Sequence, residues 1–237
     1  MTELFLETEY EEMKRLAKKL HILLPEAFWE FEVRDKRNRI TFHSKQRSHS
    51  WVRNAYNLMV CQAAAVPGDS AVGLAIVDTG GATRSDTTTQ PASGLSSGGA
   101  SNSSIYVNLG NGIYAGAGID TYGIVVGTGS NPESLESYAL GAKIASGNLA
   151  GQLSYSATDP PAISTIGTTK TVAWVRYFNN NSGGAIVVNE AGVYTRGTYD
   201  NSSATFLMCR DLLAGGVNIP NTGQLKVTYT LQLTYPA

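Results

Sequence analysis

The chain has 237 residues, a formal net charge of −1 and only 16% charged residues. This length suffices for one large β domain or two smaller ones, with a hydrophobic core large enough to be stable without disulfide cross-links. The balanced charge argues against a protein held to nucleic acid by bulk charge, so we expect no nucleic-acid partner. Cys61 and Cys209 each follow apolar residues, which predicts buried free thiols and no disulfide framework.

The first residues, MTELFLETEYEEMK, lack the basic and apolar regions of a secretory signal. No apolar run reaches the roughly 20 residues that a membrane-spanning helix requires, so we expect a chain without a membrane span that is made in a cytoplasm. Residues 1–53 hold 20 of the 37 Asp, Glu, Lys and Arg residues. This uneven charge predicts two units, a charged N-terminal α+β docking module at residues 1–67 and a β domain at residues 68–237.

The N-terminal module is predicted to be helix, β-hairpin, helix. Thr8 and Glu11 fit a capping box before residues at helical spacing, so we expect a first helix from there to near Pro25. Residues 28–43 alternate apolar and polar side chains around the turn-like DKRN, which predicts the hairpin. Ser50 is a suitable N-cap for a second helix, which the sequence VPG ends.

From Ala71 onward, short β-rich runs alternate with Gly, Asn, Ser, Thr and Pro. The runs are AVGLAIVD, SIYVNL, IYAGAGI, YGIVVG, GQLSYSA, TVAWVRYF, AIVVNEAGVYT, ATFLMCRDLL and QLKVTYTLQLTYP. They predict a mainly β fold, a β-sandwich or jelly-roll-like domain. NNNSGG at 179–184 predicts a hairpin-like connection, and NG at 111–112 a two-residue turn. Residues 82–104 have one Leu and no aromatic residue, which predicts a long Ser/Thr/Gly surface loop.

The sequence Asp78-Thr79-Gly80, which closes an apolar run, is the sharpest enzymatic signal. It resembles the catalytic strand of retroviral-type aspartic proteases, in which two aspartates share one proton. With one such triplet, these three residues could be catalytic only in a two-fold homodimer, in which IVVG at 124–127 matches the later strand. The alternative is a turn, in which Asp78 accepts an Asx-type hydrogen bond and a glycine takes a positive φ. We favour the turn, because the segment between has no recognisable flap.

Two glycine-containing motifs carry weaker signals. GLSSG at 94–98 matches a nucleophile elbow with Ser96 as the serine, but its flanks are of low complexity and no histidine follows it. LGNGIYAGAG at 109–118 lacks the spacing of a dinucleotide-binding loop and predicts a hairpin packed with small residues. We therefore expect no enzymatic activity from either motif and no bound cofactor.

Metal-ligating residues are sparse. His21, His43 and His49 fit no ligand spacing with either cysteine. Asp120 and Asp200 could join a calcium site in a loop, but no patterned series of oxygen ligands accompanies them. We therefore expect no metal site.

A basic run lies between residues 34 and 53. It consists of Arg34, Lys36, Arg37, Arg39, Lys45, Arg47 and Arg53, against a single Asp35. Such a cluster can hold phosphates or an acidic protein face and would form a docking patch. The alternative is a solvated hairpin and helix start, partly neutralised by the acidic first helix. The sequence leaves both interpretations open.

Several polar residues interrupt or flank the apolar β runs. Charges at Arg176, Glu190, Arg210 and Asp211 are costly to bury unless paired, so they predict structural ion pairs across strands or subunits. Tyr194, Tyr199 and Asn201 suggest an alternative, a lectin-like β-sandwich that holds sugar by aromatic stacking and amide hydrogen bonds. The same residue types are also ordinary in β-turns.

The order of several segments resembles a recurrent pattern in virion proteins of tailed phages and related prokaryotic viruses. The segments are GIVVGTGSNPESLESYALGAKI, GQLSY, GTTKTVAWVRYFNNNSGGAIVVNEAGVY, CRDLL and LKVTYTLQLTYP. SHSWVRNAYNLM is similar to the helix that precedes the β region in such proteins, so the resemblance spans roughly residues 49–237. It implies a non-enzymatic structural subunit of a tail, fibre base or head surface. Its location would be the virion, its partners copies of itself and other virion proteins, and the N-terminal module its docking element.

Overall fold

The structure, a computed structural model, describes residues 3–64, 74–84, 113–199 and 202–235. In chain order its elements are α1 (Glu3–Lys19), β1 (Leu24–Arg34), β2 (Ile40–Arg47), α2 (Arg53–Ala64), β3 (Ile76–Val77), β4 (Thr83–Arg84), β5 (Gly123–Gly127), β6 (Ser154–Tyr155), β7 (Ala162–Ile166), β8 (Thr169–Asn179), β9 (Ile186–Tyr199), β10 (Ser202–Ile219) and β11 (Gln224–Thr234). The fold is mainly β, as predicted, and these strands pair antiparallel. None of the described helices is both long and apolar enough to cross a membrane.

The largest sheet joins the two ends of the chain. Its strand order is β2-β1-β11-β8-β6, and β7 pairs with β8 beside this path. β1 pairs with β11 along its whole length, from Leu24 opposite Thr234 to Arg34 opposite Gln224. The hairpin of the predicted N-terminal module is therefore part of the same sheet as the C-terminal strand β11. The domain boundary expected at residue 67 does not separate this hairpin from the β domain.

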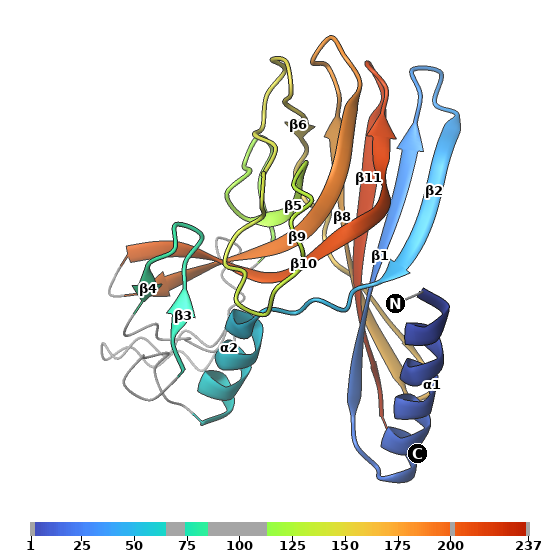
Figure 1. The fold of residues 1–237 in the computed structure, drawn as a ribbon, viewed down its shortest axis with the longest axis vertical. Coiled ribbons are helices and arrows are strands. Elements are labelled where there is room, and N and C mark those ends of the chain that lie inside the picture. Colours follow the sequence, from blue (N-terminus) through green and yellow to red (C-terminus); the bar gives the residue numbers. More distant parts are fainter. Residues whose placement is uncertain (1–2, 65–73, 85–112, 200–201, 236–237) are drawn as a thin grey trace.

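A second sheet, with strand order β10-β9-β5, packs against the first, and β3 and β4 form a short hairpin of their own. In Figure 1 the long β9–β10 hairpin runs beside β8 and β11 at one end and curves away toward β3 and β4 at the other. One core cluster joins the two sheets and includes Phe31 and Val227 from the first sheet and Val193 and Leu207 from the second. The core therefore lies between the sheets.

Strand β1 illustrates why these segments are strands. Ala27, Trp29, Phe31 and Val33 are all buried, and the residues between them are more exposed, which is the two-residue period of a strand with one buried face. Burying each large side chain of this kind contributes about 1.5–3 kcal/mol. Trp29 also packs on Tyr229 of the neighbouring β11, with ring centroids 4.4 Å apart.

Both predicted helix starts are wrong. α1 begins at Glu3, so Thr8 lies inside the helix, and it ends at Lys19, well before Pro25 in β1. α2 begins at Arg53 rather than directly after Ser50. The residues between are extended because they pair with β10, where Val52 N–H donates to the Met208 carbonyl oxygen at 3.1 Å. At α2, pairing with β10 therefore overrides a local capping signal.

Several predicted connections also differ. Residues 180–185 do not close a hairpin, because β8 and β9 belong to different sheets. Residues 113–119 form no strand. The predicted long loop does not begin at residue 82, because Thr83 and Arg84 form β4. The rest of that loop, at 85–104, lies outside the described residues. Ser96 and the NG turn at 111–112 also lie outside them.

Candidate functional site

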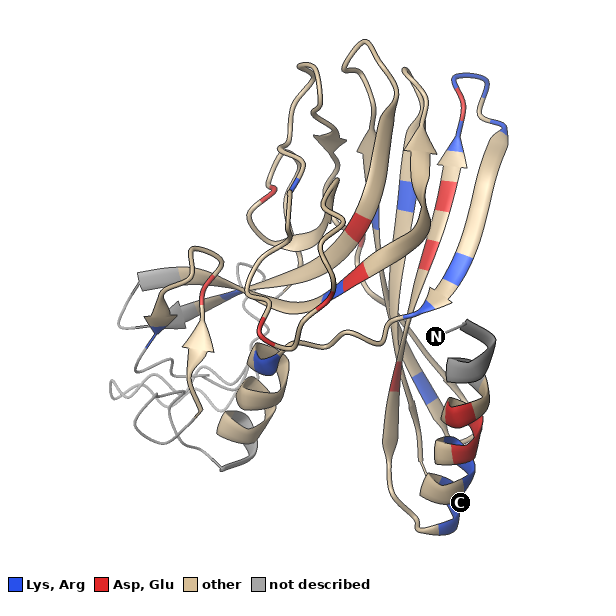
Figure 2. Ribbon diagram, viewed as in Figure 1, with Lys and Arg blue, Asp and Glu red and all other residues tan. Residues whose placement is uncertain are grey.

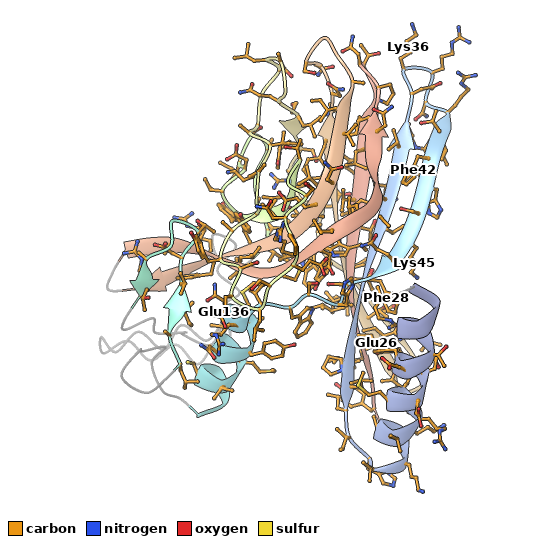
Figure 3. All side chains as sticks on the ribbon, in the orientation of Figure 1. Glu26, Phe28, Lys36, Phe42, Lys45 and Glu136 are labelled. Carbon is orange, nitrogen blue, oxygen red and sulfur yellow. The ribbon has the colours of Figure 1, made fainter. Side chains whose placement is uncertain are left out.

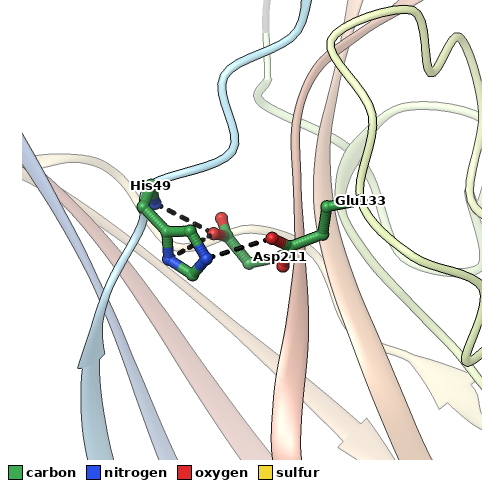
Figure 4. A group of neighbouring side chains, drawn as sticks. All are labelled: His49, Glu133 and Asp211. Carbon is green, nitrogen blue, oxygen red and sulfur yellow. Dashed lines mark hydrogen bonds and ion pairs between the residues drawn. The ribbon is translucent and has the colours of Figure 1, made fainter. Parts of the chain in front are cut away.

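Three segments far apart in the chain bring titratable side chains together (Figure 4). His49 follows β2, Glu133 lies in the loop after β5, and Asp211 lies in β10. His49 Nε2 is 3.0 Å from Glu133 Oε2, and His49 Nδ1 is 3.4 Å from Asp211 Oδ1. The Asp211 side chain is fully buried, Glu133 is 22% exposed and His49 is about half exposed. The imidazole therefore bridges two carboxylates at the edge of the core.

Hydrogen-bond donors fix both carboxylates. Asp211 Oδ2 accepts from Trp29 Nε1 at 2.8 Å and from the Ser48 hydroxyl at 2.6 Å. Glu133 Oε1 accepts from the Leu212 backbone N–H at 2.6 Å. One oxygen of each carboxylate is thus held by the fold, while the other faces the His49 ring. This supporting shell fixes the orientation of the charges before His49 joins them.

The pKa values show that the bridge is charged. The hydrogen bond to Glu133 raises the pKa of His49 to about 9, against the lowering effect of burial, and the Asp211 charge adds to the rise. Burial raises the pKa of Glu133, but hydrogen bonds from His49, Ser50 and Leu212 outweigh it and bring the pKa to about 2. At neutral pH an imidazolium therefore pairs with carboxylates on both sides.

Among the described residues, His49, Glu133 and Asp211 form the group that could offer a metal ion three ligand atoms, all within 4.8 Å of one another. A metal needs an unprotonated ring nitrogen, whereas both nitrogens of His49 already face carboxylates. The arrangement therefore favours an ion-paired clamp over a metal centre. The sequence singled out Asp211 but not Glu133, and it offered no signal that joins them to His49.

A second buried cluster centres on Glu190 of β9, which forms an ion pair across strands with Arg210 of β10. Arg210 Nε lies 2.6 Å from Glu190 Oε2. The Glu190 carboxylate also accepts the backbone N–H groups of Gly129, Gly141 and Ala142 at 2.7–3.1 Å. A Cβ atom at Gly129 would overlap Glu190, so the close approach requires glycine there. Glu190 thereby holds both ends of the loop that carries Glu133.

Arg176 is fully buried but makes a different set of contacts from the expected ion pair. Its guanidinium donates to main-chain carbonyl oxygens, those of Gly116, Ile119, Tyr122, Ile124 and Ser156. It also lies over the Tyr155 ring, 4.8 Å from the centroid. Burial lowers the pKa of Arg176 to about 10. The residue organises the irregular segment at 113–122, where the sequence predicted a strand.

The Asp-Thr-Gly triplet forms a turn between β3 and β4. Asp78 Oδ1 accepts the backbone N–H groups of Gly80 and Ala82, each at 2.9 Å, and Oδ2 accepts Arg84 Nε at 2.6 Å. Burial raises the pKa of Asp78, but these hydrogen bonds outweigh it and hold the pKa below its usual value. Gly81, with φ of 86°, takes the left-handed position. The Asx-type turn is thus present, although the glycine with positive φ is not Gly80.

Thr79 attaches this turn to the second sheet. Its backbone N–H donates to the Thr205 carbonyl oxygen at 2.9 Å, and the two threonine hydroxyls are 2.7 Å apart. Asn54 of α2 holds the preceding strand, because its side chain both donates to and accepts from the Val77 backbone. Both oxygens of the Asp78 carboxylate therefore accept hydrogen bonds from within the turn, which is itself hydrogen-bonded to β10.

The seven basic residues do not form one patch. Figure 3 shows Lys36 at the tip of the β1–β2 hairpin, Lys45 near its base and Glu136, the partner of Arg53, beside α2. Four of the seven pair with carboxylates, namely Arg34 with Glu32, Arg39 with Asp35, Arg47 with Glu26, and Arg53 with Glu136. Lys36 and Arg37 remain at the hairpin tip. The predicted docking patch is thus dispersed and largely neutralised within the chain.

The remaining candidates are placed as follows. Tyr194 is buried and its hydroxyl oxygen accepts the Leu140 N–H at 2.7 Å, so it offers no surface for sugar stacking. The Tyr199 side chain, Asn201 and Asp200 lie outside the described residues. Asp120 pairs with Lys143 at 3.0 Å. Cys61 and Cys209 are buried free thiols, as predicted.

Comparisons with known proteins give no family assignment. A scan against protein-family models, a search of curated proteins and a search of solved structures each found no match to this chain. The contacts described above are therefore the basis for a functional proposal.

Proposed function

We propose that this chain is a non-enzymatic structural subunit of a virus particle, made in a host cytoplasm, which assembles through repeated contacts with copies of itself and with other virion proteins. The mainly β fold, with two antiparallel sheets that share one core cluster, supports the proposal of a β-sandwich subunit. The N-terminal helix and hairpin, fused to the large sheet, would dock to a neighbouring protein.

The observation that carries the proposal is strand β7 at the edge of the large sheet. β7 (Ala162–Ile166) pairs with β8 along one side. All five of its residues are exposed, including Ile163 at 71% and Ile166 at 80%, and none is charged. Monomeric proteins protect edge strands with charges, prolines or covering elements, because a bare edge pairs with other chains. An uncharged edge with every residue exposed therefore suits a subunit that is covered by its neighbours.

The test compares assembly of the parent chain with that of an Ile163→Lys, Ile166→Lys variant. Both side chains are exposed, so the fold should persist, while the added charges oppose pairing at this edge. Leu149→Lys, at a 72% exposed residue away from β7, is the matched control. Light scattering and electron microscopy should show ordered assemblies for the parent and the control but not for the β7 variant. A parent chain that stays monomeric, even with other particle proteins, would refute the proposal.

A further inference from the structure

Helix α1 buries one side and exposes an apolar stripe on another. Ala17 is buried against the rest of the molecule, whereas Met13, Leu16 and Leu20 are 46%, 44% and 63% exposed. The Leu20 N–H donates to the Leu16 carbonyl oxygen at 2.9 Å, so the helical geometry continues to Leu20. Spacings of three and four residues place the three exposed side chains on one face. Figure 1 shows α1 at the margin of the molecule, beside β1.

Charge is divided along the same helix. Among the side chains of α1 that the structure describes, the acidic ones come first and the basic ones follow them (Figure 2). They are Glu9, Glu11 and Glu12, then Lys14, Arg15, Lys18 and Lys19. Glu12 and Lys19 are seven residues apart, so they lie on the same flank of the helix beside the apolar stripe. Glu12 has a long 3.8 Å contact with Arg15, in which both side chains are well exposed.

We infer that α1 pairs antiparallel with α1 of a second copy, around a two-fold axis close to Leu16. In this register Leu16 meets its own counterpart and Met13 meets Leu20 of the second copy. Glu12 then faces Lys19 of the second copy, and symmetry forms this pair twice. A parallel pairing would instead bring the acidic halves together and the basic halves together, which is unfavourable. The inference rests on the proposed function in that it names another copy as the partner.

The first experiment reverses the flanking charges in the full chain. Glu12→Lys or Lys19→Glu alone should weaken dimerisation about tenfold, because each creates two like-charge contacts in the symmetric dimer. The double variant restores opposite charges and should return the dissociation constant to within about threefold of the parent. Leu16→Glu should abolish the dimer, while Leu149→Glu, at an exposed residue elsewhere, should leave it unchanged. Analytical ultracentrifugation measures each dissociation constant.

The second experiment tests the two-fold axis with cysteine. Leu16→Cys should form a disulfide-linked dimer under mild oxidation, because a residue on the axis meets its own copy within the roughly 7 Å Cα separation that a disulfide allows. Leu20→Cys alone should not, since its own counterpart lies about four residues beyond the axis on each side, roughly 12 Å away. Mixed Met13→Cys and Leu20→Cys chains should cross-link. The native Cys61 and Cys209 are buried and do not compete.

The outcomes separate this inference from the proposed function. A parent chain that sediments as a monomer at about 100 μM, or a double charge variant no tighter than the singles, overturns the α1 pairing. If assembly with particle proteins depends on β7 but ignores every α1 variant, the pairing is wrong and the proposed function stands. If the α1 dimer forms with rescue by the double variant but no larger assembly appears, the pairing stands and the proposed function fails.

Discussion

Glu190→Ala should lower the free energy of unfolding by about 4 kcal/mol. The variant leaves the Arg210 guanidinium, whose side chain is 4% exposed, without its 2.6 Å carboxylate partner. Breaking a buried pair from one side costs about 3–5 kcal/mol, and the backbone N–H groups of Gly129, Gly141 and Ala142 also lose their acceptor. Such a loss is a large fraction of the roughly 5–15 kcal/mol stability of a typical domain.

Urea unfolding followed by tryptophan fluorescence measures this effect, since Trp29 is fully buried in the core. Glu136→Ala is the control, because it removes the exposed partner of Arg53 and should change stability little. A Glu190→Leu, Arg210→Met variant removes both charges and should recover at least half of the loss. A decrease below about 1 kcal/mol for Glu190→Ala would refute the view that this pair holds the loop.

Two further predictions concern titrating groups. The pKa of His49 is raised from 6.5 to about 9, so the stabilisation by its charged form is complete below pH 6.5 and is lost as the pH rises through 9. Below pH 6.5, His49→Gln should be less stable than the parent by about 1 kcal/mol, after allowance for solvent screening. This difference in the free energy of unfolding should vanish between pH 6.5 and pH 9. The pKa of Asp78 is lowered, so its contribution is present above pH 3.8 and is lost in acid. Asp78→Asn should therefore cost about 1–2 kcal/mol at pH 7, with faster amide exchange at Ala82, and this cost should shrink as the pH falls below 3.8. Equal exchange rates at pH 7 would contradict this.

Local patterns in the sequence predict much of the fold. The alternation of Phe31 and Val33 with polar neighbours predicts β1, and the Asx chemistry of Asp78 predicts the turn after β3. Both signals depend only on residues close in the chain, where side-chain period and turn geometry act directly. The same locality explains the failure at Thr8, where a capping pattern occurs inside a helix that continues upstream.

The rest depends on contacts between distant segments. β1 pairs with β11 across nearly the whole chain, and no local pattern specifies that register. β7 carries no alternation, because all five of its residues are exposed. His49, Glu133 and Asp211 are separated by tens of residues, so their spacing gives no ligand motif, and only the folded sheets bring them within 4.8 Å. A spacing rule for metal ligands cannot detect such a cluster.

The charged residues inside apolar runs share a physical role that the sequence did not indicate. Ion pairing alone accounts for few of their contacts. Arg176 and Arg210 donate mainly to main-chain carbonyl oxygens, and Glu190 accepts main-chain N–H groups of a loop. The loop at 128–143 forms no strand or helix, so its buried main-chain groups need partners from elsewhere.

Adjacent residues of the β9–β10 hairpin supply those partners, since Glu190 lies opposite Leu212 and Asp211 opposite Ala191. Glu190 and Arg210 form hydrogen bonds with the loop backbone. The Leu212 N–H donates to Glu133 in that loop. Glu133 and Asp211 in turn pair with His49, which follows β2. A single hairpin therefore ties an irregular loop to the segment that follows the N-terminal hairpin. Loosening Glu190 should be felt at His49, so in Glu190→Ala the pKa of His49, followed by NMR, should fall from about 9 toward 6.5.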